Sequence, residues 1–128
     1  MKECFLSFTV SSPATSYIPL PRFLMTGSCA ELSNDAKVLY ALLLDRASIS
    51  KVNDYTEPDG TIRLYFTVEQ AQKKLHRSRQ CTTQIFKELE YSGLICRKRQ
   101  GQGKPSKITL KYPADAKLIT KDGDVDVG

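Results

Sequence analysis

Residues 67–112 decide the fold, and they read TVEQAQKKLHRSRQCTTQIFKELEYSGLICRKRQGQGKPSKITLKY. The run T-V-E-Q at 67–70 is a capping box, which marks the start of a helix. After the short polar turn at 76–78, Ser78 is suited to cap a second helix and Gly93 to end it. Two β-like segments, 95–99 and 107–112, then flank a basic loop that contains glycine. The stretch therefore predicts helix, turn, helix and β-hairpin.

The helix that follows Ser78 is predicted to have two different faces. At 100° per residue, the apolar positions form one stripe, which consists of Cys81, Ile85, Leu89 and the flanking Phe86. The opposite face is polar and consists of Arg79, Gln80, Thr83 and Lys87. The first face is expected to pack in the core, and the second to meet solvent or a ligand.

Upstream of this stretch, the sequence predicts one more helix, one strand and an arm. Ser33 is expected to cap a largely buried helix that runs to about Ser48, where Leu44 lies opposite the core-facing Leu39 and is a candidate contact with another chain. A polar connection over 48–60 leads to an alternating, half-buried strand over 61–66. Residues 17–24 (YIPLPRFL) combine two prolines with large apolar side chains, which predicts an extended arm packed on its own core or on a second subunit.

Basic side chains are concentrated in the same stretch that decides the fold. Residues 73–111 hold eleven basic and two acidic side chains, a net charge of +9, whereas the whole chain of 128 residues carries only +5. Such a segment attracts polyanions. Because its charge lies on a helix-turn-helix and a hairpin, the predicted ligand is double-stranded DNA.

Individual roles follow from the chemistry of the side chains. Arg79 can donate two hydrogen bonds to guanine, Gln80 can pair in the same way with adenine, and Thr83 offers a hydroxyl and a methyl, so these three are the predicted base contacts. The predicted contacts with the DNA backbone, or through the wing, are Lys73, Lys74, Arg77, Ser78, Lys87, Arg97, Lys98, Arg99, Lys104 and Lys107.

Other function classes lack a residue pattern to support them. The four cysteines, Cys4, Cys29, Cys81 and Cys96, have no metal-binding spacing and are read as free thiols. His76 is the single histidine and has no acid or nucleophile nearby in the sequence, so no enzyme activity, cofactor or metal is expected. No apolar run is long enough to span a bilayer and the N-terminus lacks the flanks of a signal peptide, so a cytoplasmic protein is expected.

Together the elements predict an α+β winged helix-turn-helix, in the order helix–strand–helix–helix–β-hairpin with an extended N-terminal arm. Residues 1–16 are expected to be a flexible lead-in, 17–112 a winged-helix DNA-binding domain, and 113–128 a polar tail or the start of a linker.

Three blocks of the sequence carry a family resemblance. They are YIPLPRFL at 17–24; LSNDAKVLY at 32–40 with LDR at 44–46, SKVN at 50–53 and DG at 59–60; and GLICRKRQGQGKP at 93–105. In these blocks the chain resembles the N-terminal domain of the plasmid replication initiator protein A family of Gram-positive bacteria. It departs from the family at 53–55, where NDY stands in place of the usual Asn-Gly-Trp.

The resemblance implies a bacterial protein that binds repeated sites at a plasmid or mobile-element replication origin, usually as a homodimer. It also implies recruitment of host replication proteins through a separate C-terminal domain, which the sequence ending at Gly128 is expected to lack. The predicted dimer arm consists of Tyr17, Ile18, Leu20, Phe23 and Leu24. Two alternatives stay open: a winged-helix transcription regulator with the same DNA contacts, and a protein-interaction winged-helix module in which the charge is incidental.

Overall fold

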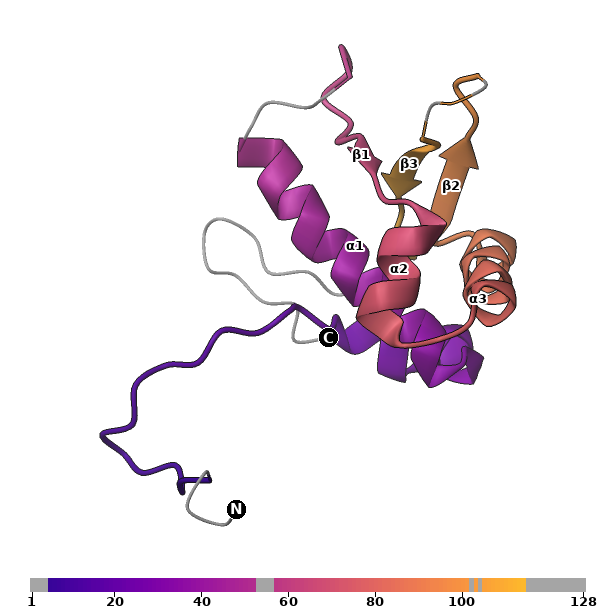
Figure 1. Ribbon diagram of the computed structural model, residues 1–128. Coiled ribbons are helices and arrows are strands. Elements are labelled where there is room, and N and C mark those ends of the chain that lie inside the picture. Colours follow the sequence, from indigo (N-terminus) through magenta and orange to yellow (C-terminus); the bar gives the residue numbers. More distant parts are fainter. Residues whose placement is uncertain (1–4, 53–56, 102, 104, 115–128) are drawn as a thin grey trace.

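The computed structural model describes residues 5–52, 57–101, 103 and 105–114, with the side chains of these residues except those of 49–52. The predicted order of helix, strand, helix, helix and hairpin is confirmed, and two 3-10 helices are added before it (Figure 1). In chain order the elements are η2 (Arg22–Met25), η3 (Gly27–Glu31), α1 (Asn34–Val52), β1 (Leu64–Tyr65), α2 (Val68–Leu75), α3 (Arg79–Ser92), β2 (Ile95–Lys98) and β3 (Lys107–Leu110).

Helix α1 begins where the sequence predicts and ends later. The backbone N–H of Ala36 donates to the Ser33 hydroxyl at 3.1 Å, so Ser33 acts as the predicted cap. Asp35 lies in the first turn, where its negative charge is stabilised by the positive end of the helix dipole. The helix continues to Val52 instead of ending near Ser48, because residues 48–52 contain neither a glycine nor a proline to interrupt it.

Helix α1 is buried around most of its circumference. The side chains of Leu39 and Leu43 are fully buried, as predicted, but so is Ala41 on the other side of the helix. Lys37 on that side is only 7% exposed, because its ammonium donates to the Ala30 carbonyl of η3. Leu44 follows on the same side, is half-buried and packs against the core of its own chain. The contact between Leu44 and another chain therefore stays a prediction, and only the part of the side chain outside the core is available for it.

Helices α2 and α3 begin and end at the capping residues that the sequence predicts or at the turn between them. At the start of α2, the Thr67 hydroxyl accepts from the backbone of Gln70 while the Gln70 side chain accepts from the backbone of Thr67. His76 ends α2 in the left-handed conformation, at φ 56°. Ser78 caps α3 by accepting from the backbone N–H of Cys81. Gly93 ends α3 at φ 91°, a backbone conformation that glycine adopts without steric strain.

The three strands form an antiparallel sheet in the order β1-β3-β2, with Ile108 of the central strand facing Leu64 on one side and Arg97 on the other. The predicted hairpin is confirmed as β2 and β3. Strand β1 is shorter than the predicted strand over 61–66, since its ladder with β3 consists of Leu64 with Ile108 and Tyr65 with Lys107. Thr61 belongs to the preceding turn, where its carbonyl accepts from the backbone N–H of Glu57. Alternation still places Leu64 and Phe66 in the core.

The hydrophobic core lies between α1, α2, α3 and the inner face of the sheet, and its fully buried side chains include Leu39, Phe86 and Ile108. Tyr40 brings a polar group into this core, and its hydroxyl donates to the Lys111 carbonyl just beyond β3. Burial, with a smaller contribution from the nearby Cys29, raises the pKa of Tyr40 to about 12. Three helices and a β-hairpin around one core make a winged helix, as predicted.

The arm predicted over residues 17–24 divides into two parts. Its first part is exposed, with Tyr17 at 83% and Leu20 at 49%. Its second part belongs to η2, where Leu24 is fully buried and the Phe23 ring meets the Tyr40 ring edge-on with 5.8 Å between centroids. The prediction of a dimer contact is therefore wrong for Leu24, which is fully buried in its own core. Phe23 is half-buried against the same core, and its part in a dimer arm stays a prediction.

Residues 5–20 lead away from the body of the domain without helix or strand (Figure 1). Large apolar side chains in this segment are at least 80% exposed at Phe5, Leu6, Phe8 and Val10. Among the helices that the structure describes, none is long and apolar enough to cross a lipid bilayer.

Candidate nucleic-acid interface

Helix α3 has the two faces that its sequence predicts, with one change in the inner face. Ile85, Phe86 and Leu89 are buried, whereas Cys81 is only half-buried. The fully buried place near the start of the helix belongs to Thr82, whose hydroxyl donates to the Ser78 carbonyl at 2.8 Å. Because that backbone hydrogen bond satisfies the hydroxyl, Thr82 can be buried, although the apolar pattern predicts its neighbour Cys81 as the inward-facing residue.

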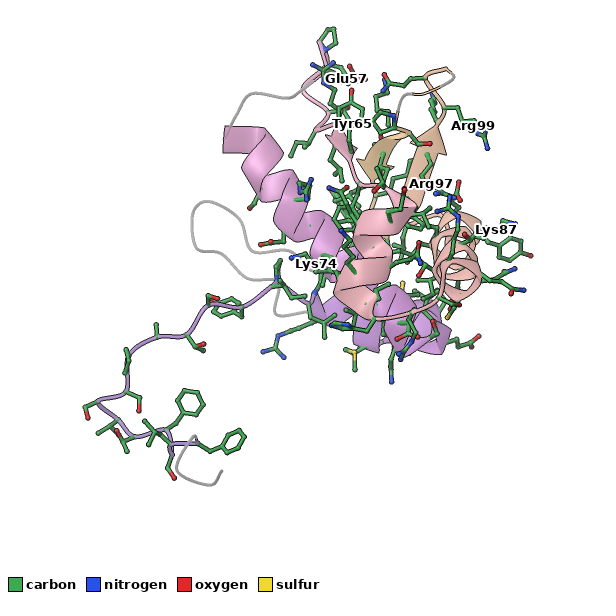
Figure 2. All side chains as sticks on the ribbon, viewed as in Figure 1. Glu57, Tyr65, Lys74, Lys87, Arg97 and Arg99 are labelled. Carbon is green, nitrogen blue, oxygen red and sulfur yellow. The ribbon has the colours of Figure 1, made fainter. Side chains whose placement is uncertain are left out.

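The outer face of α3 displays the predicted base contacts. Arg79 and Gln80 lie in the first turn and are exposed, and Thr83 is half-buried one turn later. Lys87 is exposed one further turn along the helix (Figure 2). A helix that presents an exposed Arg and an exposed Gln from its N-terminal turn has the geometry for reading base edges in a major groove.

The basic side chains predicted to contact the DNA backbone fall into two groups. The ion pairs among the described residues engage Arg63, Arg77, Arg97 and Lys107. The remaining basic side chains of the predicted site are exposed; Lys104 lies outside the described residues. We call this set of exposed basic side chains the cationic face, although the strand register places Lys98 on the side of the wing opposite Arg99. It consists of Lys73, Lys74, Arg79, Lys87, Lys98 and Arg99.

Arg77 ties the turn between α2 and α3 to the start of α1. Its Nε donates to one carboxylate oxygen of Asp35 at 3.0 Å and its Nη2 to the other at 3.3 Å. This hydrogen-bonded pair raises the pKa of Arg77. The Nε–Nη2 edge of the guanidinium is thus engaged by Asp35, so Arg77 positions the helix-turn-helix, while its side chain remains 48% exposed.

Arg97 is engaged in the same way at the other end of the site. Its guanidinium lies over the Phe86 ring, 4.4 Å from the centroid, and donates to a Glu90 carboxylate oxygen at 2.8 Å. Its side chain is only 21% exposed. Arg97 therefore joins β2 to α3, and its charge is balanced by Glu90.

Lys107 pairs with Glu57 across the sheet edge, and Arg63 approaches the same carboxylate at 3.7 Å. The hydrogen bond from Lys107 is the main reason that the pKa of Glu57 is lowered. Figure 2 shows Glu57 beside the strands, away from Lys87 on α3. Lys107 thus anchors the segment before β1 and does not belong to the cationic face.

Sequence reasoning missed four residues around this interface. Gln84 is exposed one turn after Gln80, and Tyr91 is 97% exposed one turn after Lys87, so the helical spacing of 3.6 residues could have identified both. Gln100 closes the base of the wing loop by donating from its side-chain amide to the Pro105 carbonyl at 3.1 Å. Ser106 lines a hollow at the wing base, which no sequence signal indicates.

The thiols and acids do not gather into a second kind of site. Cys29, Cys81 and Cys96 are free and half-buried, and Cys4 lies outside the described residues. Within the ranges that the structure describes, no three His, Cys, Asp or Glu side chains are placed to hold a metal ion together.

Comparisons with known proteins agree with this arrangement. The chain is similar to a 41 kDa protein from Lactobacillus helveticus, with 31% identity over 100 residues that make up 73% of this chain and 28% of that protein. The chain thus spans less than a third of the length of this curated relative.

Solved structures are similar over most of the chain. An N-terminal domain of a DNA-binding protein has 29% identity and a TM-score of 0.67, with 91% of this chain and 88% of that chain covered. A Rep–DNA complex has 29% identity and a TM-score of 0.67, with coverage of 92% and 89%. An MDR initiator has 32% identity and a TM-score of 0.65, with coverage of 84% and 83%.

The family model described as the N-terminus of replication initiator protein A (RepA) matches residues 16–121. This match covers most of the chain and includes every described residue of the helix-turn-helix and the wing. The chain therefore belongs to the family of replication initiator protein A N-terminal domains.

Proposed function

We propose that this chain is the duplex-DNA-binding domain of a plasmid or mobile-element replication initiator, and that it binds a specific site repeated at the replication origin. The observation that carries the proposal is the cationic face, whose exposed basic side chains come from α2, α3 and both sides of the wing of a winged helix. The family membership and the likeness to a Rep–DNA complex support it. The function is one of binding in the bacterial cytoplasm, without a catalytic step.

The residues of the cationic face, with Gln80 and Thr83, make two kinds of contact with DNA. Arg79 and Gln80 each present a pair of hydrogen-bonding atoms to base edges, with Thr83 beside them, and so provide sequence discrimination. The lysines Lys73, Lys74 and Lys87 neutralise phosphates on either side of the groove, which adds affinity for any sequence. Lys98 and Arg99 bring the wing to the backbone or the minor groove.

The test is fluorescence anisotropy against short duplexes tiled over the upstream and coding DNA of the chain's own gene, measured across a salt series. We expect one repeated tile to bind more than ~10³-fold tighter than the others, with affinity falling steeply as salt rises. A tight tile confined to the chain's own promoter would favour the transcription regulator. Equal weak binding to all tiles would contradict sequence-specific recognition, and no binding at low salt would favour a protein-interaction module.

We also propose that the domain acts as a homodimer through the exposed part of its arm, Tyr17, Ile18 and Leu20. Tyr17 is 83% exposed, and Ile18 and Leu20 keep 39% and 49% of their surface exposed. A run of exposed apolar side chains is typical of an interface. Sedimentation equilibrium at high micromolar concentration should give a dimer mass for the unmodified protein and a monomer mass for a variant with all three residues changed to Ser. A monomer mass for the unmodified protein would contradict the proposal.

In a complete initiator, a further domain would recruit host replication proteins to the origin that this domain has bound. This step is proposed for the whole protein, of which the matched region covers 28% in the curated relative.

A further inference from the structure

The base of the wing contains a polar hollow that the proposed base contacts and lysines do not use. It has a volume of about 150 Å³ and lies where the hairpin leaves α3. Its lining consists of Glu90 from α3, Arg97 from β2, and Arg99 and Ser106 from the two sides of the wing loop. Three of these four side chains can donate hydrogen bonds, so the hollow suits an acceptor.

The register of the hairpin explains why Arg99 and Ser106 meet there. Lys98 faces Lys107 in the last pair of the β2–β3 ladder, so the next pair outward is Arg99 with Ser106. Side chains alternate along a strand, which places Arg99 on the same side as Arg97 and Lys98 on the other. In Figure 2, Arg99 projects from the wing on the side where Lys87 and α3 lie.

The hollow is lined by two cationic side chains and one anionic side chain, so one cation is available to bind a ligand. The Arg97 guanidinium is held by the Glu90 carboxylate at 2.8 Å and by the Phe86 ring, which fixes it in place and balances its charge. Arg99 is exposed and takes part in none of the ion pairs among the described residues. The net charge of the lining is therefore +1, which matches a group with a single negative charge.

We propose that this hollow binds one phosphodiester group of the DNA backbone, with the Arg99 guanidinium and the Ser106 hydroxyl as its donors. Arg97 and Glu90 are positioning residues that hold the wing against α3, so that this phosphate is bound at a fixed place relative to Arg79 and Gln80. The inference rests on the proposed function and deepens it. It separates Arg99, which binds one particular phosphate, from Lys98, which adds charge on the other side of the wing.

The experiment replaces single phosphates of the bound duplex by neutral methylphosphonates, one position at a time. Each duplex is titrated with the unmodified protein, with Arg99→Ala and with the matched control Lys98→Ala. We expect one position at which the methylphosphonate weakens binding of the unmodified protein and of Lys98→Ala, but weakens Arg99→Ala no further. Arg99→Ala should also lower the salt slope by about 1, whereas Ser106→Ala should weaken binding and leave the slope unchanged.

Arg99 and Ser106 lie on the wing surface, and unchanged thermal unfolding of both variants would show that the fold is intact. If every methylphosphonate weakens Arg99→Ala as much as it weakens the unmodified protein, the hollow binds no phosphate and the proposal is overturned. The same holds if Lys98→Ala reproduces the Arg99→Ala pattern. A failure of the proposed function is recognised separately, because the unmodified protein would then bind no duplex tightly.

Discussion

Helices α1 and α3 pack against each other in the same small domain, yet they differ in how much of their surface is buried. Helix α1 is buried nearly all round, including Ala41 and Lys37 on the side away from Leu39. Helix α3 is divided sharply, with Ile85 and Phe86 buried and its outer face open. A helix covered on all sides can only support the fold, whereas a helix with one open face can also meet a ligand.

The two helices are also joined by polar links at both ends of the proposed reading surface. Asp35 of α1 holds Arg77 just before α3, and Ser33 before α1 holds Glu88 in the third turn of α3. The difference between the helices therefore indicates a division of roles. Helix α1 fixes the orientation of α3, and α3 carries the chemistry.

The largest expected effect is the loss of core packing in α1. Leu39→Ala removes a fully buried side chain and should lower the free energy of unfolding by about 2 to 5 kcal/mol. Val38→Ala, on the same helix but 39% exposed, is the matched control and should cost less than about 1 kcal/mol. Urea denaturation measures both. Equal losses for the two variants would contradict the assignment of α1 as a buried scaffold helix.

The second prediction concerns Tyr40 of α1, which should make the stability of the fold depend on pH in the alkaline range. The pKa of Tyr40 is about 12 in the folded protein and 10.0 for an ordinary tyrosine, so the unfolded chain loses this proton first. The stabilisation is thus fully present below about pH 10 and is lost as the pH rises to about 12, a total of about 2 to 3 kcal/mol.

The matched variant for this window is Tyr40→Phe, which has no hydroxyl to titrate. It should be less stable at neutral pH by about 1 kcal/mol, because the hydrogen bond to the Lys111 carbonyl is lost. The unmodified protein should then lose about 2 kcal/mol between pH 10 and 12 while Tyr40→Phe loses none, so the difference in unfolding free energy should shrink and then change sign. Parallel pH profiles would show that Tyr40 does not carry this dependence.

A substitution on the outer face of α3 should change the discrimination between DNA sequences and not the stability of the fold. Arg79→Ala removes an exposed side chain, so the unfolding free energy should stay within about 0.5 kcal/mol of the unmodified value. The preference for the specific duplex over a scrambled one should fall by about 1 to 3 kcal/mol. Arg22→Ala, an exposed arginine of η2, is the control for charge alone. Full discrimination by Arg79→Ala would place the base contacts elsewhere on the helix.

Much of this molecule is predictable from the sequence because its signals are local. The capping box at Thr67, the Ser78 cap and the Gly93 stop act within one helical turn, and the structure confirms all three. The alternation of apolar and polar residues on α3 predicts which side chains are exposed. These are the parts of a fold that neighbouring residues decide.

The contacts that the sequence does not reveal are made between residues distant in sequence. Arg77, Arg97 and Lys107 look like free charges in the sequence, because their partners Asp35, Glu90 and Glu57 come from other elements. Phe23 and Leu24 follow two prolines and resemble an exposed arm until α1 provides the surface that buries them. A pattern read along the chain cannot identify a partner that only the tertiary fold brings near.

The smallest expected effect tests the link that joins the two helices. The Glu88 carboxylate accepts from both the backbone N–H and the hydroxyl of Ser33, each at 2.7 Å, and so satisfies a donor at the start of α1. Glu88→Ala should lower the free energy of unfolding by about 1 to 2 kcal/mol, since charge-assisted hydrogen bonds are lost. Glu31→Ala, an exposed acid at the end of η3, controls for the change in net charge.

Glu88 is half-buried between α3 and the start of α1, so it is not expected to contact DNA itself. If Glu88 also orients α3, its removal should weaken binding of the specific duplex more than binding of a scrambled one. An equal change in affinity for both duplexes would show that the hydrogen bonds between Ser33 and Glu88 contribute to stability and not to the orientation of α3.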